Sequence, residues 1–168
     1  MNFAFDIVKI HKHHFLIIAA EDGLQFVSLT NDGWDEYDQL FPKYLDKYTY
    51  TRRPAVIKPY KKALQDFFDG NNHLSDLSIS QDLGGTELQQ ATWAALRQLP
   101  QGKTTTYSEL AAEIGQPKSF RAVASAVAKN PVGVVIPCHR VLRKDGGLGD
   151  FRGGLKFKIG RASCRERV

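Results

Sequence analysis

The sequence has 168 residues, of which 42% are apolar, and its formal net charge is +5 at pH 7. This length accommodates one large domain or two small ones, and no apolar run approaches the ~20 residues that a membrane-spanning helix needs. The first residues lack the basic flank of a signal peptide, and two cysteines are too few for a disulfide framework or a cysteine-based zinc site. These features favour an intracellular, reducing compartment, and we expect a cytoplasmic protein.

The start of the chain alternates between apolar and polar side chains, as β-strands do. We expect one strand near the N-terminus, a second over residues 14–20, then a turn, and a third over residues 24–29. His11 and His13 would share a strand face and suggest a metal site, but the sequence offers no third ligand nearby. A solvated strand end or turn is therefore the favoured interpretation of these histidines.

The next segment is predicted to be helical with interruptions. Pro42 breaks a helix within residues 35–48, and Gly70 ends a second helix that starts at Tyr60. A short strand at residues 77–79 follows, and after it a glycine-containing linker to a second domain.

The chain changes character at Thr86. Thr86 and Gln89 fit a capping box at the start of a helix that runs to Leu99. An extended segment follows, and Ser108 is the predicted N-cap of a short helix. A turn containing glycine then leads to another helix, over residues 119–129. The side chains of the first helix that we expect to face the core are Leu88, Ala91, Ala95 and Leu99.

The last two of these helices form a helix-turn-helix pattern. A strand over residues 132–136 and a glycine-rich region at 145–147 are predicted to add a wing. The second helix has no Asn, Gln or Arg in its middle to read base edges in a major groove, and Arg121 near its start is its one large charged side chain. Its alanines favour close approach to a minor groove, and simple helix packing is the other interpretation.

Charge is distributed unevenly between the two halves. Residues 1–82 contain 9 Lys/Arg and 12 Asp/Glu, a net of −3, whereas residues 83–168 contain 14 Lys/Arg and 6 Asp/Glu, a net of +8. A basic half beside a mildly acidic one indicates that the C-terminal half meets a polyanion.

One short segment carries candidate reaction chemistry. The apolar run 134–136 is typical of a buried strand, which would end at Pro137, and Cys138, His139 and Arg140 follow it. An imidazole and a guanidinium beside a cysteine favour thiolate, the nucleophilic form of sulfur. A buried, inert cysteine beside a surface histidine remains the alternative.

Several motifs of the second half occur together in one known family. They are Thr92-Trp93, Gly102 to Tyr107, Arg121-Ala122-Val123, Asn130-Pro131, Ile136 to Val141 and Gly149 to Lys156. Together they resemble the O6-alkylguanine-DNA alkyltransferases, also called methylated-DNA–protein-cysteine methyltransferases. The resemblance covers about residues 84–158, and the Pro-Cys-His-Arg run is its most specific part. It implies an α+β fold, with an N-terminal ribonuclease-H-like α/β domain over residues 1–82 and a C-terminal winged-helix-like (helix-turn-helix) DNA-binding and catalytic domain over residues 83–158. Residues 159–168 do not resemble the family.

The resemblance also implies a reaction, direct-reversal DNA repair. Cys138 would take the alkyl group from O6 of guanine in DNA, with O4-alkylthymine as a second candidate substrate. His139 would draw off the thiol proton through a water, and Tyr107 would hydrogen-bond the departing guanine oxygen. Asn130 would position the cysteine, and Arg121 would fill the place of the flipped nucleotide.

The other DNA-contacting residues that the resemblance implies are Ala122, Ala126, Val127, Arg140, Val141, Phe151, Arg152 and Gly153. Family members commonly have Tyr and Ser where this chain has Phe151 and Arg152, so Phe151 lacks the tyrosine hydroxyl, whereas contacts at position 152 would depend on its backbone N–H. They also have a glutamate that orients the histidine, and Glu166 is the one carboxylate in this chain's tail. The implied reaction uses no metal and no cofactor. The implied partner is double-stranded DNA carrying alkylated bases, bound through the minor groove by a monomer.

Three other functions remain open from the sequence. A lesion-binding module would flip alkylated bases without repairing them, although relatives of that kind lack the cysteine. A Cys-His hydrolase or acyltransferase would turn over on an ester or amide. A transcription regulator would bind lesion-free duplex through the helix-turn-helix, which the alanine-rich second helix disfavours.

Overall fold

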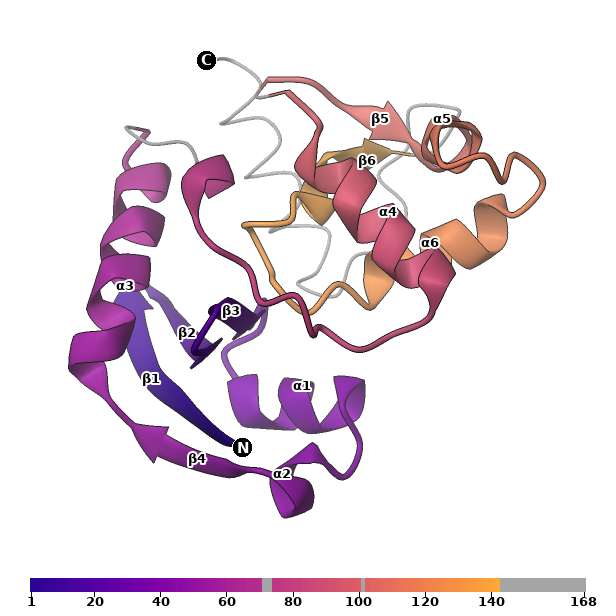
Figure 1. Cartoon of the computed structure of the whole chain (residues 1–168). Helices are drawn as coiled ribbons and strands as arrows, with labels where there is room; N and C mark the ends of the chain where they lie inside the picture. The colour runs from indigo at the N-terminus through magenta and orange to yellow at the C-terminus, as the bar shows by residue number, and fades with distance from the viewer. Residues whose placement is uncertain (71–73, 101, 143–168) are drawn as a thin grey trace. The chain divides into compact units, whose positions relative to one another are not determined.

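The computed structural model describes residues 1–70, 74–100 and 102–142 (Figure 1). The chain divides into two compact units, the first comprising Met1–Leu83 with Pro131–Val135, and the second comprising Gly84–Asn130 and the chain from Ile136 onward. From the sequence, residues 131–135 were assigned to the C-terminal domain, whereas the structure groups them with the first unit. Among the described helices, none is long and apolar enough to cross a bilayer.

The first unit is built on a four-stranded sheet of order β3-β2-β1-β4. β1 pairs antiparallel with β2, and β2 with β3, whereas β4 lies parallel to β1. The first three strands confirm the alternation seen in the sequence, and β4 was not predicted. The strands are β1 (Asn2–Ile10), β2 (His13–Ala20), β3 (Gly23–Val27) and β4 (Thr49–Arg52).

Helices cover both faces of this sheet (Figure 1). α3 packs on β1 and β2 from one side, and α1 packs on β2 with an aromatic core between them. The predicted break at Pro42 is confirmed, whereas α3 starts at Pro54, six residues before the predicted Tyr60. The helices are α1 (Gly33–Leu40), α2 (Tyr44–Lys47), α3 (Pro54–Phe68) and the 3-10 turn η1 (Leu74–Asp76). The buried members of the core are Phe3, Leu16, Ile18, Phe26, Tyr37 and Phe41.

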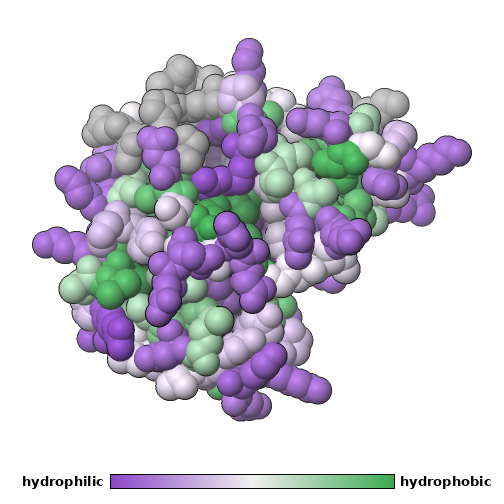
Figure 2. Space-filling model, viewed as in Figure 1, coloured by the Kyte–Doolittle hydropathy of each residue, from purple (hydrophilic) through white to green (hydrophobic). Residues whose placement is uncertain are grey.

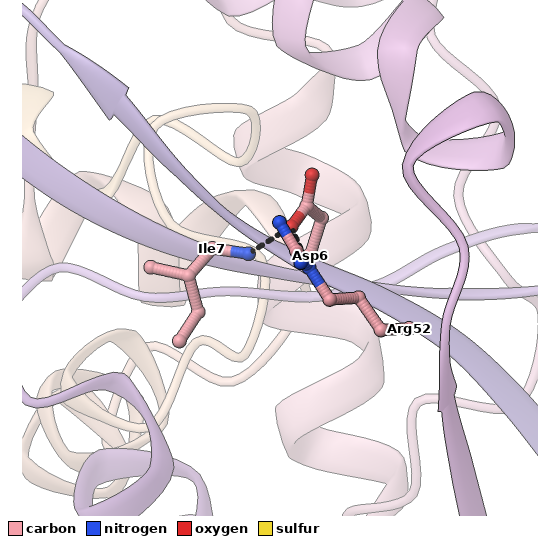
Figure 3. Close-up of polar contacts among 3 residues, drawn as sticks. All are labelled: Asp6, Ile7 and Arg52. Carbon is pink, nitrogen blue, oxygen red and sulfur yellow. Dashed lines mark hydrogen bonds and ion pairs between the residues drawn. The ribbon is translucent and has the colours of Figure 1, made fainter.

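A buried carboxylate ties β1 to the strand that the sequence did not reveal (Figure 3). Asp6 Oδ1 accepts one hydrogen bond from the Ile7 backbone N–H at 2.9 Å and another from Arg52 Nε of β4 at 2.9 Å. Both bonds compensate the loss of solvent around this carboxylate. Asp6 is therefore explained as a structural residue.

His11 and His13, the two histidines considered for a metal site, lie in a turn and at the start of a strand. His11 lies in the β1–β2 turn with a φ of 56°, and its Nε2 is 3.2 Å from Asp69 Oδ1. The ring of His13 packs on Phe15 with centroids 4.4 Å apart. Within the described residues no group of three or more His, Cys, Asp or Glu is placed to hold a metal ion. The interpretation as a strand end and turn is confirmed.

In its described part, the second unit contains three α-helices that pack against one another. The capping box of α4 is confirmed, because Thr86 Oγ1 accepts from the Gln89 N–H and Gln89 Oε1 accepts from the Thr86 N–H. Its predicted core stripe was wrong, since Thr92, Trp93 and Leu96 are the residues that are buried. The elements are α4 (Glu87–Arg97), β5 (Thr105–Thr106), α5 (Tyr107–Glu113), α6 (Phe120–Ala128), the 3-10 turn η2 (Cys138–Arg140) and β6 (Val141–Leu142).

The helix-turn-helix is formed by α5 and α6, close to the predicted bounds. The N-cap of α5 is Thr106, whose hydroxyl accepts from the Glu109 N–H at 3.1 Å, and the prediction of Ser108 was wrong. Tyr107 therefore begins a helix instead of ending a strand. The residues predicted to complete a wing at 145–147 lie outside the described part of the chain.

Candidate active site

The segment that leads to Cys138 is buried, as predicted, but it is not a strand. Val132 forms an isolated bridge with Val27, and the chain then turns through Val134, which has a φ of 68°. Cys138 is the first residue of the 3-10 turn η2, so the prediction of a cysteine at a strand end was wrong. A β-branched residue at positive φ is uncommon, and it prevents a continuous strand here.

Packing around Gly133 explains why this apolar run turns. The Gly133 N–H donates to Val27 O at 3.0 Å, and the Val27 N–H donates to Pro131 O at 3.0 Å. A Cβ atom at position 133 would lie 2.6 Å from Leu29 Cδ2, which is closer than real Cβ contacts. Close approach of the backbone to Leu29 therefore requires glycine, and the only regular pairing of this apolar run within the described residues is the single bridge from Val132 to Val27.

Asn130 holds the turn immediately before the cysteine. Its side chain is fully buried, and Nδ2 donates to Ile136 O at 2.9 Å. The Cys138 N–H donates to the same carbonyl at 2.8 Å. The Ile136 carbonyl oxygen thus joins Asn130, which lies shortly after the end of α6, to the backbone of Cys138. Pro137, between Ile136 and Cys138, restricts the backbone further.

The two-stranded pairing of β5 with β6 joins the segments that carry Tyr107 and Cys138. Thr105 pairs with Val141 and Thr106 with Leu142, in parallel. Tyr107 follows β5 directly, and the Cys138–Arg140 turn precedes β6 directly. The parallel pairing therefore places Tyr107 just beyond one end of this small sheet and the Cys138–Arg140 turn just before its other end.

The cysteine turn is enclosed by the protein. Cys138, His139 and Arg140 are 2%, 1% and 6% exposed. Arg140 Nη1 donates to Pro100 O at 3.3 Å, which ties the turn to the loop after α4. A thiol next to an imidazole in a turn of fixed backbone is suited to nucleophilic chemistry, because the nucleophile and a proton acceptor are held together.

The structure separates the predicted DNA-contacting residues into two groups. On α6, Arg121 and Ala122 are exposed, whereas Ala126 and Val127 are buried against the unit. Val141 is buried as well. Contacts from the buried side chains to DNA therefore have no support in this structure, because each packs inside the unit. The other residues assigned to the site, Phe151, Arg152, Gly153 and the tail carboxylate Glu166, lie outside the described residues.

Two features near the site were not found from the sequence. Trp93 Nε1 donates to Ala126 O at 2.9 Å and so links α4 to α6. Phe120, the first residue of α6, is 44% exposed, although an aromatic residue in an alanine-rich helix would be expected in the core. Periodicity could not have indicated this exposure, because Phe120 precedes Val123 by three residues and Val127 by seven, which is the spacing of one buried stripe.

The described residues also form a hollow of about 800 Å³ in the first unit. Its walls come from β1, the β2–β3 turn, α2 and α3, and none of the predicted site residues lines it. The hollow is therefore not the reaction centre predicted from the sequence.

Comparisons with known proteins agree with this geometry. The profile described as "6-O-methylguanine DNA methyltransferase, DNA binding domain" matches residues 87–162. The inducible methylated-DNA–protein-cysteine methyltransferase of Bacillus subtilis (strain 168) is 32% identical over 145 residues, which are 86% of this chain and 80% of that protein. A methylated-DNA–protein-cysteine methyltransferase of Methanosarcina acetivorans is 31% identical over 151 residues, 85% of each chain.

The fold matches as well. A crystal structure of Mycobacterium tuberculosis OGT in complex with DNA is similar with a TM-score of 0.77 at 25% identity, covering 99% of this chain and 94% of that one. This likeness extends over both α+β units, and the sequence matches reach from the N-terminal sheet to the cysteine turn. The chain therefore belongs to the family of methylated-DNA–protein-cysteine methyltransferases.

Proposed function

We propose that this chain repairs DNA by direct reversal, moving the alkyl group of O6-alkylguanine to the sulfur of Cys138 once per protein molecule. The observation that carries the proposal is the enclosed Cys138–His139 turn, whose backbone is held by Asn130 in a unit that the family's DNA-binding profile matches. The relatives' own name describes the same acceptor chemistry.

The chemistry is a displacement at carbon. The sulfur of Cys138 attacks the alkyl carbon, an S–C bond forms, and the C–O6 bond breaks with its electron pair going to guanine. His139 takes the thiol proton, and Tyr107 donates a proton toward the departing oxygen, so guanine leaves neutral. The net result moves the thiol proton to guanine. The thioether has no route back to thiol, which limits each molecule to one reaction.

Asn130 acts as a positioning residue in this scheme. The bond from Nδ2 to Ile136 O fixes the peptide unit before Pro137, and the Cys138 N–H shares that acceptor. A nucleophile must meet its carbon within a narrow range of distance and angle, so this bond supports the orientation of the sulfur.

The two units fit the finer description of the family fold. The order β3-β2-β1-β4 with a parallel β4, covered by helices on both faces, supports a ribonuclease-H-like assignment for the first unit. The packed helices α4, α5 and α6 with the β5–β6 pair support a winged-helix-like assignment for the second.

DNA reaches the site through the exposed face of α6. That face carries Arg121 with the small residues Ala122, Ser125 and Ala128, so the helix backbone can approach the minor groove of a duplex closely. O6 of guanine lies inside the base stack, so the target nucleotide is flipped out and Arg121 takes its place. The protein acts as a monomer on duplex DNA, and the positive charge of the C-terminal half favours this partner.

The test is a single-turnover transfer assay. A duplex that carries O6-methylguanine with a labelled methyl group is mixed with excess protein, and label is expected on the peptide that contains Cys138. With excess DNA the yield should level off at one equivalent per protein. Cys138→Ala should transfer nothing and still bind the lesion duplex.

The second cysteine of the sequence provides the matched control. Cys164→Ser should keep the full yield, because the proposal assigns the reaction to Cys138 alone. Label on Cys164, repeated turnover, or tight lesion binding with no transfer would each overturn the proposed function.

A further inference from the structure

One exposed aromatic side chain has no role in the mechanism so far. The large apolar side chains that are exposed in the described part of the chain are Met1, Ile7, Leu45, Val56 and Phe120, and Phe120 alone among them belongs to the second unit. Phe120 is 44% exposed and lies at the first position of α6. It contributes little to the core of its unit, which α6 reaches through Val123, Ala126 and Val127.

The neighbour of Phe120 adds a second flat group. The Arg121 guanidinium carbon lies 5.8 Å from the centroid of the Phe120 ring, a cation–π distance. The aromatic ring and the planar cation are therefore next to each other at the start of α6. Both are exposed, so both are available to a ligand with flat faces.

The rest of the helix favours a nucleic acid as that ligand. Beyond its first two residues, the exposed side chains within α6 are small, and the helix contains no acidic residue. Lys118 before it and Lys129 after it are exposed and basic. A smooth, positively charged face with two flat projections at one end matches a duplex surface into which side chains are inserted between bases.

We propose that Phe120 and Arg121 together form a stacking wedge for unpaired nucleobases in duplex DNA. This inference rests on the proposed function, in which a nucleotide leaves the stack and its neighbours lose a stacking partner. Arg121 occupies the vacated position, and the ring of Phe120 stacks on an adjacent base. Stacking on an aromatic side chain compensates part of the cost of unstacking. Phe120 thereby increases the population of duplex whose target base is flipped out.

The experiment compares substrates that do and do not need unstacking. Transfer rates are measured for Phe120→Ala with lesion duplex and with the free O6-methylguanine base. The duplex rate should fall by about tenfold, the loss expected for one stacked base, whereas the rate with the free base should not change. Phe120→Trp keeps an aromatic face and should stay close to the parent protein.

The chain offers a matched control in Val56, which is 43% exposed in the first unit. Val56→Ala removes an exposed apolar side chain of similar exposure from the other unit and should leave both rates unchanged. An unchanged duplex rate in Phe120→Ala would overturn the wedge. So would an equal loss with duplex and free base, since that pattern indicates a damaged unit.

A second readout separates the wedge from the repair reaction. 2-Aminopurine is placed next to the lesion in the same strand, and its fluorescence is followed on binding to Cys138→Ala, which cannot react. Adding Phe120→Ala to this variant should change the fluorescence of the bound duplex, because the probe loses an aromatic partner. Identical signals would overturn the wedge, whereas a difference would support it even if the parent protein transferred no alkyl group.

Discussion

Two buried polar side chains, Glu36 in the first unit and Asn130 in the second, hold different parts of the chain. Glu36, 5% exposed, accepts from the Leu29 N–H at 2.9 Å and from the Thr30 N–H at 2.7 Å, and so fixes the chain between β3 and α1. Asn130 instead donates to the carbonyl that the Cys138 N–H also uses. Both arrangements satisfy buried polar groups. Glu36 fixes the connection between β3 and α1, whereas Asn130 fixes the turn that carries the cysteine.

This difference predicts different consequences of mutation. Removing a polar partner in the first unit should cost folding free energy and leave the chemistry of each folded molecule unchanged. Removing a polar partner beside Cys138 should also lower the transfer rate of the molecules that remain folded. Most surfaces of the molecule take no part in either effect, and hydrophilic side chains cover most of the face shown in Figure 2.

The largest expected effect on stability is that of Glu36→Ala. It leaves the Leu29 and Thr30 N–H groups without their charged acceptor, which should lower the free energy of unfolding by about 2–4 kcal/mol. Urea denaturation followed by tryptophan fluorescence measures it, and Trp34 reports on this unit when Trp93 is replaced by Phe. The transfer rate per folded molecule should stay at the parent value.

The control for that prediction is Glu36→Gln, which keeps an acceptor without the charge and should show an intermediate loss. A large fall in transfer rate for either variant, measured where the protein is fully folded, would contradict the comparison. Glu36 would then act on the reaction as well as on the fold.

The next largest effect is expected for Asn130→Asp. The carboxylate has the size of the amide but cannot donate to Ile136 O, so the turn before Cys138 loses its fixed position. The transfer rate should fall by about 10- to 100-fold, the range for a misplaced reacting group. Stopped-flow transfer at matched folded fraction measures the loss. A parent-like rate would show that the bond from Asn130 serves the fold alone.

Local signals accounted for much of the first unit and for the helices of the second. The capping box at Thr86 and Gln89 was predicted because both halves of that motif lie within one turn of helix. The three N-terminal strands were predicted because alternation is also a local property. β4 was missed because its four residues, Thr49–Arg52, become a strand through pairing with β1, to which Arg52 also adds the ion pair with Asp6.

In the candidate site, the sequence indicated the residues but not the backbone conformation that carries them. Residue types singled out Cys138 and its neighbours, and the resemblance to the family assigned their roles, but the strand predicted before them is a turn in the structure. The cause is a contact distant in sequence, between Gly133 and Leu29, which no local pattern contains. The N-cap of α5 is Thr106 and not Ser108, again because of a contact distant in sequence: the pairing of β5 with β6 decides where the extended segment ends.

A smaller effect is expected for Trp93→Phe, which sharpens the comparison within the second unit. The indole N–H donates to Ala126 O at 2.9 Å, and its loss should lower stability by about 1 kcal/mol. The transfer rate should not change, because this bond joins two helices and does not touch the cysteine turn. Thermal melting by circular dichroism gives the stability. A rate loss as large as that of Asn130→Asp would extend the reaction machinery beyond the turn.

The smallest effect concerns Asp22, an exposed carboxylate of the first unit. The Gln81 backbone N–H donates to its Oδ2 at 2.9 Å, and chiefly this bond holds the pKa of Asp22 below its ordinary value of 3.8. Because the pKa is lower in the folded state, the stabilisation is complete above the unfolded value and is lost as pH falls through the folded one. Asp22→Asn should therefore be slightly less stable than the parent at about pH 6, and the gap should close toward about pH 3. Paired urea titrations at the two pH values measure this gap, and one that persists at the acidic end would mean that the contact acts through its geometry and not through its charge.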